Sequence, residues 1–129
     1  MLVTFPYIMR SEANTRSHWA ARHRRASEGR ELATLYLRMV MATEPAPEMP
    51  VVVTLTRISP RQLDEDNLSR AFKAIRDGVA DALLPTNVGN QHRRWADDSD
   101  GQILWLYAQR KGEPKEHAVE IKIEPKGTD

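Results

Sequence analysis

The sequence predicts a single mixed α+β domain, α/β in the broad sense, built on a mixed β-sheet, and three observations support this. The chain has 129 residues, of which 40% are hydrophobic and 29% charged, as in an ordinary globular domain with one core. Segments rich in β-branched residues alternate with segments of helical periodicity. The expected order of elements is β-α-β-α-β-β, without internal repeats. We therefore expect residues 1–129 to form one domain, with residues 125–129 as a disordered tail.

Composition and hydropathy argue against several classes of protein. The chain has no cysteine, so disulfide bonds and thiolate metal sites are not available to it, and a reducing cytosol suits it. The first residues lack the apolar core of a signal peptide, and no apolar run approaches the roughly 20 residues that span a membrane. We therefore expect a cytoplasmic protein without a membrane partner.

The first half of the chain predicts a strand, a long helix and a proline-rich connection. Leu2–Ile8 is short and rich in β-formers, and its proline favours an edge strand or a strand end. After a polar loop over residues 11–17, we expect a helix that begins between residues 16 and 19 and ends near residue 41, with a break or bend at Gly29. Three prolines within residues 43–50 prevent the helix from continuing.

The middle of the chain predicts a buried strand followed by an amphipathic helix. Val51–Ile58 is nearly continuously apolar at its start and rich in β-branched residues, which is typical of a central strand covered on both faces. An acidic stretch follows directly. The apolar residues between Leu68 and Leu83 then recur at intervals of one, three and four, which predicts a helix with one face on a core. Asp66 is its expected N-cap.

The last third of the chain predicts a long loop and two strands. Residues 85–101 lack any periodicity, and a loop of this length in a compact domain is more often functional than idle. Ile103–Gln109 predicts a strand, Lys111–Lys115 a turn, and Ala118–Glu124 a half-exposed strand, since apolar and charged residues alternate in it.

Charge is distributed unevenly along the chain although the net charge is only +1. Residues 10–38 contain seven arginines and three glutamates, a local charge of +4. Residues 64–100 contain eight acidic and five basic residues, a local charge of −3. This pattern suits a polyanion that is held by the basic region and processed by a metal ion in the acidic one. Two solvated faces of opposite sign explain it equally well.

Two acidic groups flank the predicted central strands. Asp64 and Asp66 follow the strand at Val51–Ile58, and an acidic run at residues 97–100 precedes the strand at Ile103–Gln109. If these strands are neighbours, we expect the two groups to converge at one mouth of the sheet. Carboxylates without histidine or cysteine partners suit Mg²⁺ or Mn²⁺, which serve phosphate chemistry. The simpler alternative is a helix cap with a solvated acid in the first group and a polar turn in the second.

The order of these features resembles one family. Asp64-x-Asp66-Asn67-Leu68, a helix that carries a cation, a variable loop, Asp97-Asp98 and a strand are together similar to the RusA family of Holliday junction resolvases of phages and prophages. The segment Ser11–Trp19, which contains Asn14 and precedes the basic helix, also resembles that family. The resemblance extends from about Leu2 to Glu124.

The resemblance implies a RusA-like fold and a homodimeric, Mg²⁺-dependent endonuclease, with Mn²⁺ as a substitute, that nicks four-way junctions symmetrically in a bacterial host cell. It implies no small-molecule cofactor. Asp64 and Asp66 match the family's first two catalytic aspartates, and Asp98 matches the third. Counting back from the following strand favours Asp100 instead, so Asp100 is a further candidate metal ligand.

The catalytic cation departs from the family pattern. The family has a lysine four residues after the second aspartate, where this chain has Arg70. Lys73 lies one helical turn further on, so either residue could stabilise the pentavalent phosphate. Arginine is always charged and binds phosphate in a bidentate manner, but it is a poor proton donor.

Candidate DNA contacts follow from charge, position and the resemblance. They are one amide and seven basic side chains: Asn14, Arg16, Arg22, Arg24, Arg25, Arg93, Arg94 and Lys111. Three functions are compatible with the sequence: a metal-dependent junction endonuclease, a non-catalytic protein that binds branched DNA on the same fold, and a metal-binding structural or regulatory protein that does not bind DNA. The basic helix argues against the third.

Overall fold

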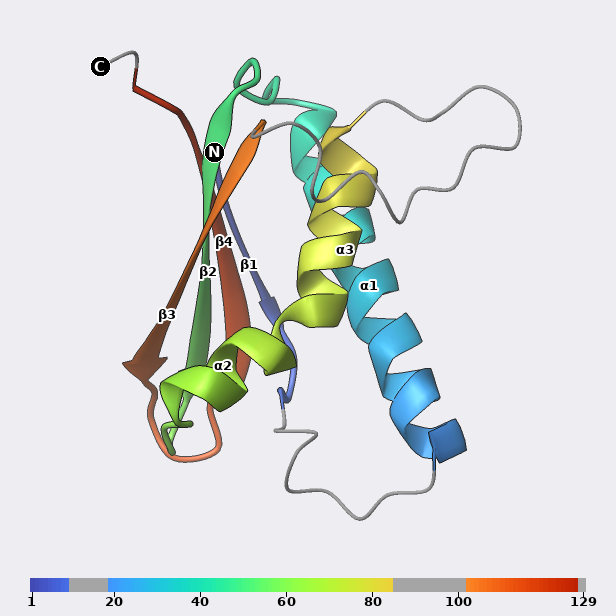
Figure 1. Ribbon diagram of the computed structural model, residues 1–129, viewed down its shortest axis with the longest axis vertical. Coiled ribbons are helices and arrows are strands. Elements are labelled where there is room, and N and C mark those ends of the chain that lie inside the picture. Colours follow the sequence, from blue (N-terminus) through green and yellow to red (C-terminus); the bar gives the residue numbers. More distant parts are fainter. Residues whose placement is uncertain (10–18, 85–101, 128–129) are drawn as a thin grey trace.

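The computed structural model describes residues 1–9, 19–84 and 102–127 (Figure 1). The described residues form a single mixed α+β domain with a four-stranded sheet and three helices, which confirms the predicted class. In chain order, the elements are β1 (Leu2–Pro6), α1 (Trp19–Met41), β2 (Val51–Ser59), α2 (Glu65–Ala71), α3 (Lys73–Leu83), β3 (Ile103–Lys111) and β4 (Ala118–Pro125).

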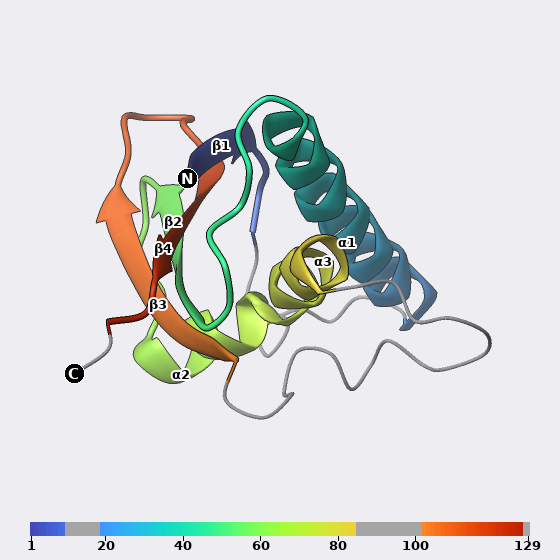
Figure 2. The same cartoon turned by 90° about the horizontal axis from the view of Figure 1, so that it is seen from above.

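The sheet is mixed, with the strand order β1-β4-β2-β3. The inner strand β2 is antiparallel to β4 and parallel to β3, with Val51 opposite Ile103 and Ser59 opposite Lys111. The prediction that β2 is a central strand is therefore confirmed. The expected cover on both faces is not: α1 and α3 lie against one face, and the described part of the chain places no helix on the other (Figures 1 and 2).

The core lies between the helices and one face of the sheet. Alternate residues of each strand point into it, because side chains along a strand alternate between faces. The fully buried large side chains are Phe5, Phe72, Leu37, Leu55, Ile75, Ile121, Ile123, Val51, Val53, Val79 and Val119. Phe5 of β1 stacks on Tyr36 of α1, with ring centroids 5.0 Å apart, and this contact fixes α1 to the edge of the sheet.

Two glycines allow α1 to pack closely against its neighbours. A Cβ atom at Gly78 of α3 would lie 2.3 Å from the carbonyl oxygen of Arg30. The backbone of α1 at Arg30 therefore packs directly against α3 at Gly78, where a side chain would not fit. A Cβ at Gly29 would lie 2.8 Å from Oη of Tyr7. A break at Gly29 does not occur, because α1 continues through this residue.

The predicted helix after β2 is two helices, α2 and α3, which meet at Phe72. The backbone N–H of Phe72 is shared between the carbonyl oxygens of Leu68 and Ser69, at 3.2 and 3.3 Å, and its ring is fully buried and stacks on Tyr107 of β3. The change of direction places α2 across the end of the sheet while α3 runs along its face (Figure 1). The periodicity of the sequence does not reveal this break, because the residues on both sides remain helical.

The ends of several strands differ from their predicted positions. β1 ends at Pro6, two residues earlier than predicted, and β3 continues to Lys111. β4 includes Pro125, where a disordered tail was expected, and the backbone N–H of Lys126 donates to the carbonyl oxygen of Pro50 over 3.0 Å.

Within the described residues, no helix is long and apolar enough to cross a membrane.

Candidate active site

The acidic stretch begins α2 at the end of the sheet where β2 ends. Asp64 has extended backbone angles, with φ −62° and ψ 151°, and its carbonyl oxygen accepts the N–H of Leu68 over 2.8 Å. Asp64 is therefore the N-cap residue, and the prediction that Asp66 caps the helix is wrong, because helical geometry already starts at Glu65. The side chain of Asp64 makes no capping hydrogen bond. The carboxylate of Asp64 therefore takes no part in capping the helix.

All three carboxylates of this stretch face solvent. Asp64, Glu65 and Asp66 are exposed, and none of their side chains forms a hydrogen bond or ion pair within the part of the chain that the structure describes. Negative charge in the first turn of α2 is favourable with respect to the helix dipole, which offsets part of the repulsion between the three acids. The remaining repulsion among the three carboxylates favours the binding of a cation beside them.

The two candidate cations lie on different helices. Arg70 is in the last turn of α2, is exposed and has no ion-pair partner among the described residues. Lys73 is the first residue of α3 and lies 3.4 Å from a carboxylate oxygen of Asp77, with 79% of its side chain exposed. The expectation that both cations share one continuous helix is wrong, because α2 ends before Phe72. Arg70 is the cation in the same helix as Asp66.

Side chains of β2 and β3 hold the loop that leads into Asp64. The carboxamide of Gln109 donates to the carbonyl oxygen of Leu63 over 2.7 Å and accepts its N–H over 2.9 Å. Arg57 donates from Nη1 to the carbonyl oxygen of Arg61. Arg57 is only 6% exposed, and burial lowers the pKa of its guanidinium.

Sequence reasoning did not find these two residues, although one signal was present. Arg57 lies two residues after Leu55, on the face of β2 that points into the core. An arginine at such a position is unusual, because core-facing positions are mostly aliphatic. Gln109 gives no comparable signal, because a polar residue near the end of an edge strand is ordinary.

The acidic run at residues 97–100 leads into the sheet at the end opposite to Asp64, contrary to the expectation that both acidic groups meet at one end. β2 and β3 are neighbours, as expected, but they are parallel, and the N–H of Val51 donates to the carbonyl oxygen of Gln102 over 2.9 Å. Gln102 therefore lies at the amino-terminal end of β2, whereas Asp64 follows its carboxyl end. Neighbouring strands alone do not bring the two groups to one mouth of the sheet, because that would require antiparallel strands.

The remaining acidic candidates, Asp98 and Asp100, lie outside the described residues. Within the described ranges, no group of three or more acidic, histidine or cysteine side chains is close enough to hold a metal ion. The described part of the candidate site is thus a pair of exposed carboxylates, Asp64 and Asp66, with an exposed Glu65 between them.

Some candidate DNA contacts lie at the same end of the molecule as the acidic stretch. The amino-terminal end of α1, which carries Arg24 and Arg25, lies at the end of the molecule where α2 lies (Figure 1). Arg24 is exposed and Arg25 half-buried. Lys111 is exposed and pairs in register with Ser59, the last residue of β2. Arg22 is in α1, but its side chain is not described, and the other candidates lie outside the described residues: Asn14, Arg16, Arg93 and Arg94.

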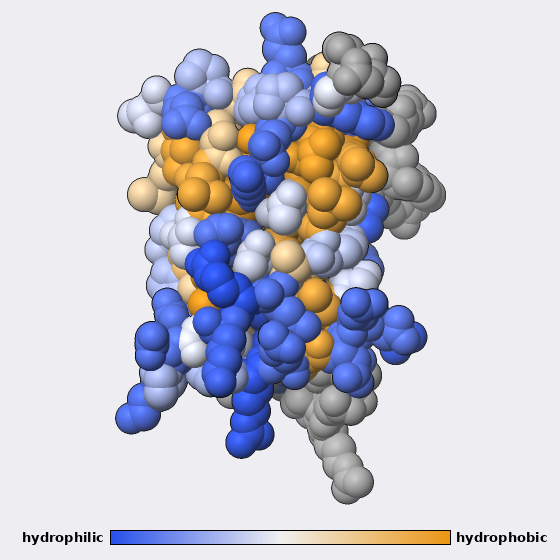
Figure 3. Space-filling model, turned by 90° about the vertical axis from the view of Figure 1, so that its left-hand side faces the viewer, coloured by the Kyte–Doolittle hydropathy of each residue, from blue (hydrophilic) through white to orange (hydrophobic). Residues whose placement is uncertain are grey.

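The surface of the sheet opposite the helices is divided into two halves. Figure 3 shows hydrophilic residues over its lower half, where β2 and β3 end, and apolar residues over much of its upper half. Leu104 and Leu106, near the start of β3, are 44% and 46% exposed. On this face, the end of the sheet that carries the candidate site is therefore mainly polar.

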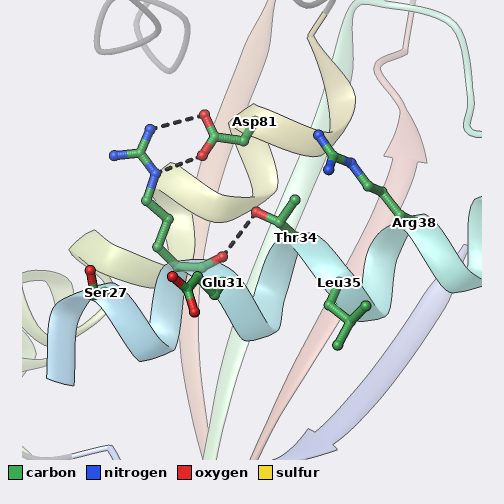
Figure 4. Close-up of a pocket in the computed structure, with 7 residues that line it drawn as sticks. Ser27, Glu31, Thr34, Leu35, Arg38 and Asp81 are labelled. Atoms are coloured by element: carbon green, nitrogen blue, oxygen red, sulfur yellow. Dashed lines mark hydrogen bonds and ion pairs between the residues drawn. The ribbon is translucent and has the colours of Figure 1, made fainter. Parts of the chain in front are cut away.

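Two hollows lined by described residues differ in character. The larger, about 530 Å³, lies on the helical side between α1 and α3, where Arg38 and Asp81 face it from opposite walls (Figure 4). Arg30 binds Asp81 there with two hydrogen bonds, of 2.6 and 3.0 Å, so much of the charge is already neutralised. The smaller, about 380 Å³, lies beside the acidic stretch between α2 and β3 and is lined by Glu65, Leu68, Tyr107, Ala108 and Gln109. Its position suits the candidate site better, despite its size.

No protein-family model matches the chain, and no curated protein is significantly similar to it.

Proposed function

We propose that the chain is a structure-selective endodeoxyribonuclease of the RusA type, which uses Mg²⁺ to resolve Holliday junctions or other branched DNA in recombination and repair. The observation that carries the proposal is the condition of Asp64 and Asp66: both carboxylates are exposed, and no described residue engages either. Carboxylates that neither cap a helix nor pair with a cation are available to a metal ion. They stand in the sequence context Asp64-x-Asp66-Asn67-Leu68, on which the resemblance to the family rests.

The donor set suits Mg²⁺ or Mn²⁺. Asp64 and Asp66 provide hard oxygen ligands, and the ion would be completed by a third carboxylate and by water. Bound Mg²⁺ would supply an activated water and neutralise charge on the phosphoryl oxygens. Arg70, which is exposed on the same helix, would bind the scissile phosphate through its planar guanidinium. Lys73 is the weaker candidate, because it already lies beside Asp77.

Chain length ranks Asp98 ahead of Asp100 as the third carboxylate, but neither can reach Asp64 of the same chain. Gln109, which is bonded to Leu63 next to Asp64, is seven residues from Gln102 along the chain, about 23 Å at 3.3 Å per residue. Asp100 is two residues from Gln102 and can extend at most about 7 Å from it, and Asp98 at most about 14 Å. Both fall short of the site of the same chain, so a third carboxylate from this run would have to come from the partner subunit of the proposed homodimer.

The basic residues at this end of the molecule would hold the DNA. Arg24, Arg25 and Lys111 are the described members of this set, and contacts of this kind to phosphates supply affinity without sequence preference. Symmetric nicking of a junction needs two active sites, so a homodimer is part of the proposal.

The experiment that tests the proposal compares a synthetic four-way junction with a linear duplex of the same sequence. We expect paired nicks in the junction with Mg²⁺, none with EDTA, and little cleavage of the linear duplex. Cleavage of both substrates at equal rates would contradict selectivity for branched DNA. If neither Mg²⁺ nor Mn²⁺ produced nicks, the proposed nuclease activity would be contradicted.

A second function, non-catalytic binding of branched DNA on the same fold, has one observation in its favour. The carbonyl oxygen of Gln102 is bonded at the end of β2 opposite to Asp64, so the sheet itself does not assemble a third ligand beside the pair. On this alternative the same junction would shift in a gel with or without Mg²⁺ and remain intact.

A further inference from the structure

We infer that Arg57 and Gln109 are positioning residues, which hold the loop at residues 61–63 against the end of the sheet and so set the place of Asp64 and Asp66. We call them the anchor pair. The inference that the anchor pair affects metal affinity rests on the proposed function. The inference that it holds the loop at residues 61–63 does not.

Gln109 binds the residue immediately before the N-cap of α2. Its carboxamide satisfies both backbone groups of Leu63, accepting the N–H over 2.9 Å and donating to the carbonyl oxygen over 2.7 Å. One planar side chain thus takes the place of a neighbouring strand in pairing with this residue. Because Asp64 is covalently next to Leu63, the position of the first carboxylate depends on these two bonds.

Arg57 binds the same loop two residues earlier. It donates from Nη1 to the carbonyl oxygen of Arg61 and from Nε to that of Met9, the latter over 3.4 Å. Its neighbours on the same face of β2, Val53 and Leu55, are fully buried and apolar. No described carboxylate lies within ion-pair distance of Arg57, and a buried charge without a counter-ion is costly. A position filled for packing alone would carry an aliphatic side chain, so the guanidinium serves the carbonyl groups that it binds.

The two anchors act as a unit because the sheet places them side by side. Arg57 of β2 and Gln109 of β3 are register partners in the parallel pair. One transverse row of the sheet therefore bonds the loop at Arg61 and Leu63 and brings it to the start of α2. The row belongs to paired strands, so it is rigid compared with the exposed carboxylates that it positions.

The first test measures the loop and needs no nuclease activity. In Gln109→Ala, we expect the amide of Leu68, whose bond to Asp64 opens α2, to exchange with solvent about tenfold faster or more, while the amide of Val79 in α3 keeps its rate. Gln102→Ala is the matched control, since Gln102 is an exposed glutamine at the other end of the sheet. Unchanged exchange at Leu68 in Gln109→Ala would overturn the inference.

The second test separates positioning from folding. In Gln109→Ala and Arg57→Met, we expect the Mn²⁺ concentration that half-saturates the protein, measured by electron paramagnetic resonance, to rise by about tenfold or more. The affinity for a four-way junction in EDTA should stay unchanged, and Arg57→Lys should restore part of the Mn²⁺ affinity, because its ammonium can still donate to one carbonyl oxygen. Loss of junction affinity and Mn²⁺ affinity together would indicate a structural role only and overturn the inference.

The two tests distinguish failure of the inference from failure of the proposed function. If the unaltered protein binds no Mn²⁺, the proposed function fails, and the exchange rate of Leu68 alone decides whether the anchor pair positions the loop. If Mn²⁺ binds and Gln109→Ala changes neither measurement, the inference fails and the proposed function stands.

Discussion

The backbone N–H of Val51 donates to the carbonyl oxygen of Gln102 over 2.9 Å, which fixes the end of the sheet at which the chain enters β3. This end is opposite to the one at which β2 leads into Asp64. The candidate site is therefore built at the carboxyl ends of β2 and β3, from α2, the loop before it and the side chains of the strand ends. The relationship also makes the third carboxylate the most informative residue to test.

The first prediction concerns the metal ligands. Asp64→Asn and Asp66→Asn should each weaken Mn²⁺ binding strongly, because an amide is a neutral and poorer ligand than a carboxylate. Glu65→Gln, which removes the same charge from the same exposed turn, should have a much smaller effect. Calorimetric titration with Mn²⁺ measures all three. Equal loss in the three variants would mean that the cluster attracts cations only by its total charge.

The second prediction concerns the two alternatives for the third carboxylate. Asp98→Asn should reduce junction cleavage by at least about a hundredfold, as expected for loss of several kcal/mol of transition-state stabilisation. Asp100→Asn should retain most of the activity, because its reach from Gln102 is shorter. Single-turnover cleavage of a labelled junction measures both rates. The reverse order of effects would place Asp100 in the site.

The third prediction concerns DNA binding. Arg24→Ala and Lys111→Ala should each weaken junction binding and reduce the slope of log affinity against log salt by about 1, because each removes one phosphate contact. Lys126→Ala is the matched control, since Lys126 is exposed at the other end of the sheet, bonded through its backbone to Pro50. Anisotropy titrations at several salt concentrations measure the slopes. An equal change in Lys126→Ala would show that only net charge matters.

Strong local patterns made much of the fold predictable. The β-branched run from Val51 identified β2, and the apolar spacing identified the helical residues of α3. The direction of β3 relative to β2 was not predictable, because hydrophobic patterning specifies which residues are buried and says nothing about strand direction. The break at Phe72 was hidden because its residue stays in helical backbone geometry, with φ −83° and ψ −3°.

The candidate site was predictable only in part. Asp64 and Asp66 were identified by their spacing after a strand, and the structure places both at the start of α2. Gln109 escaped prediction because its role depends on a contact with Leu63 across 46 residues of sequence. The N-cap was assigned to Asp66 when it is Asp64, since neighbouring acids offer the same local signal and backbone geometry decides between them.

The fourth prediction concerns the packing of α1 on α3. Gly78→Ala should destabilise the domain by about 1–3 kcal/mol, because the added Cβ would lie 2.3 Å from the carbonyl oxygen of Arg30 and 2.9 Å from Cβ of Ala33. Gly127→Ala is the control, since a Cβ there meets no atom within 4 Å. Urea denaturation measures the free energy of unfolding of both. Similar values for the two variants would contradict the close approach of the helices.

The most direct test of the central claim is cleavage of a labelled four-way junction by the unaltered chain and by Asp66→Asn, with Mg²⁺ and with EDTA. We predict paired nicks by the unaltered chain with Mg²⁺ only, and a complex without nicks for Asp66→Asn. Cleavage by Asp66→Asn at the rate of the unaltered chain, or an intact junction in every mixture, would contradict the claim.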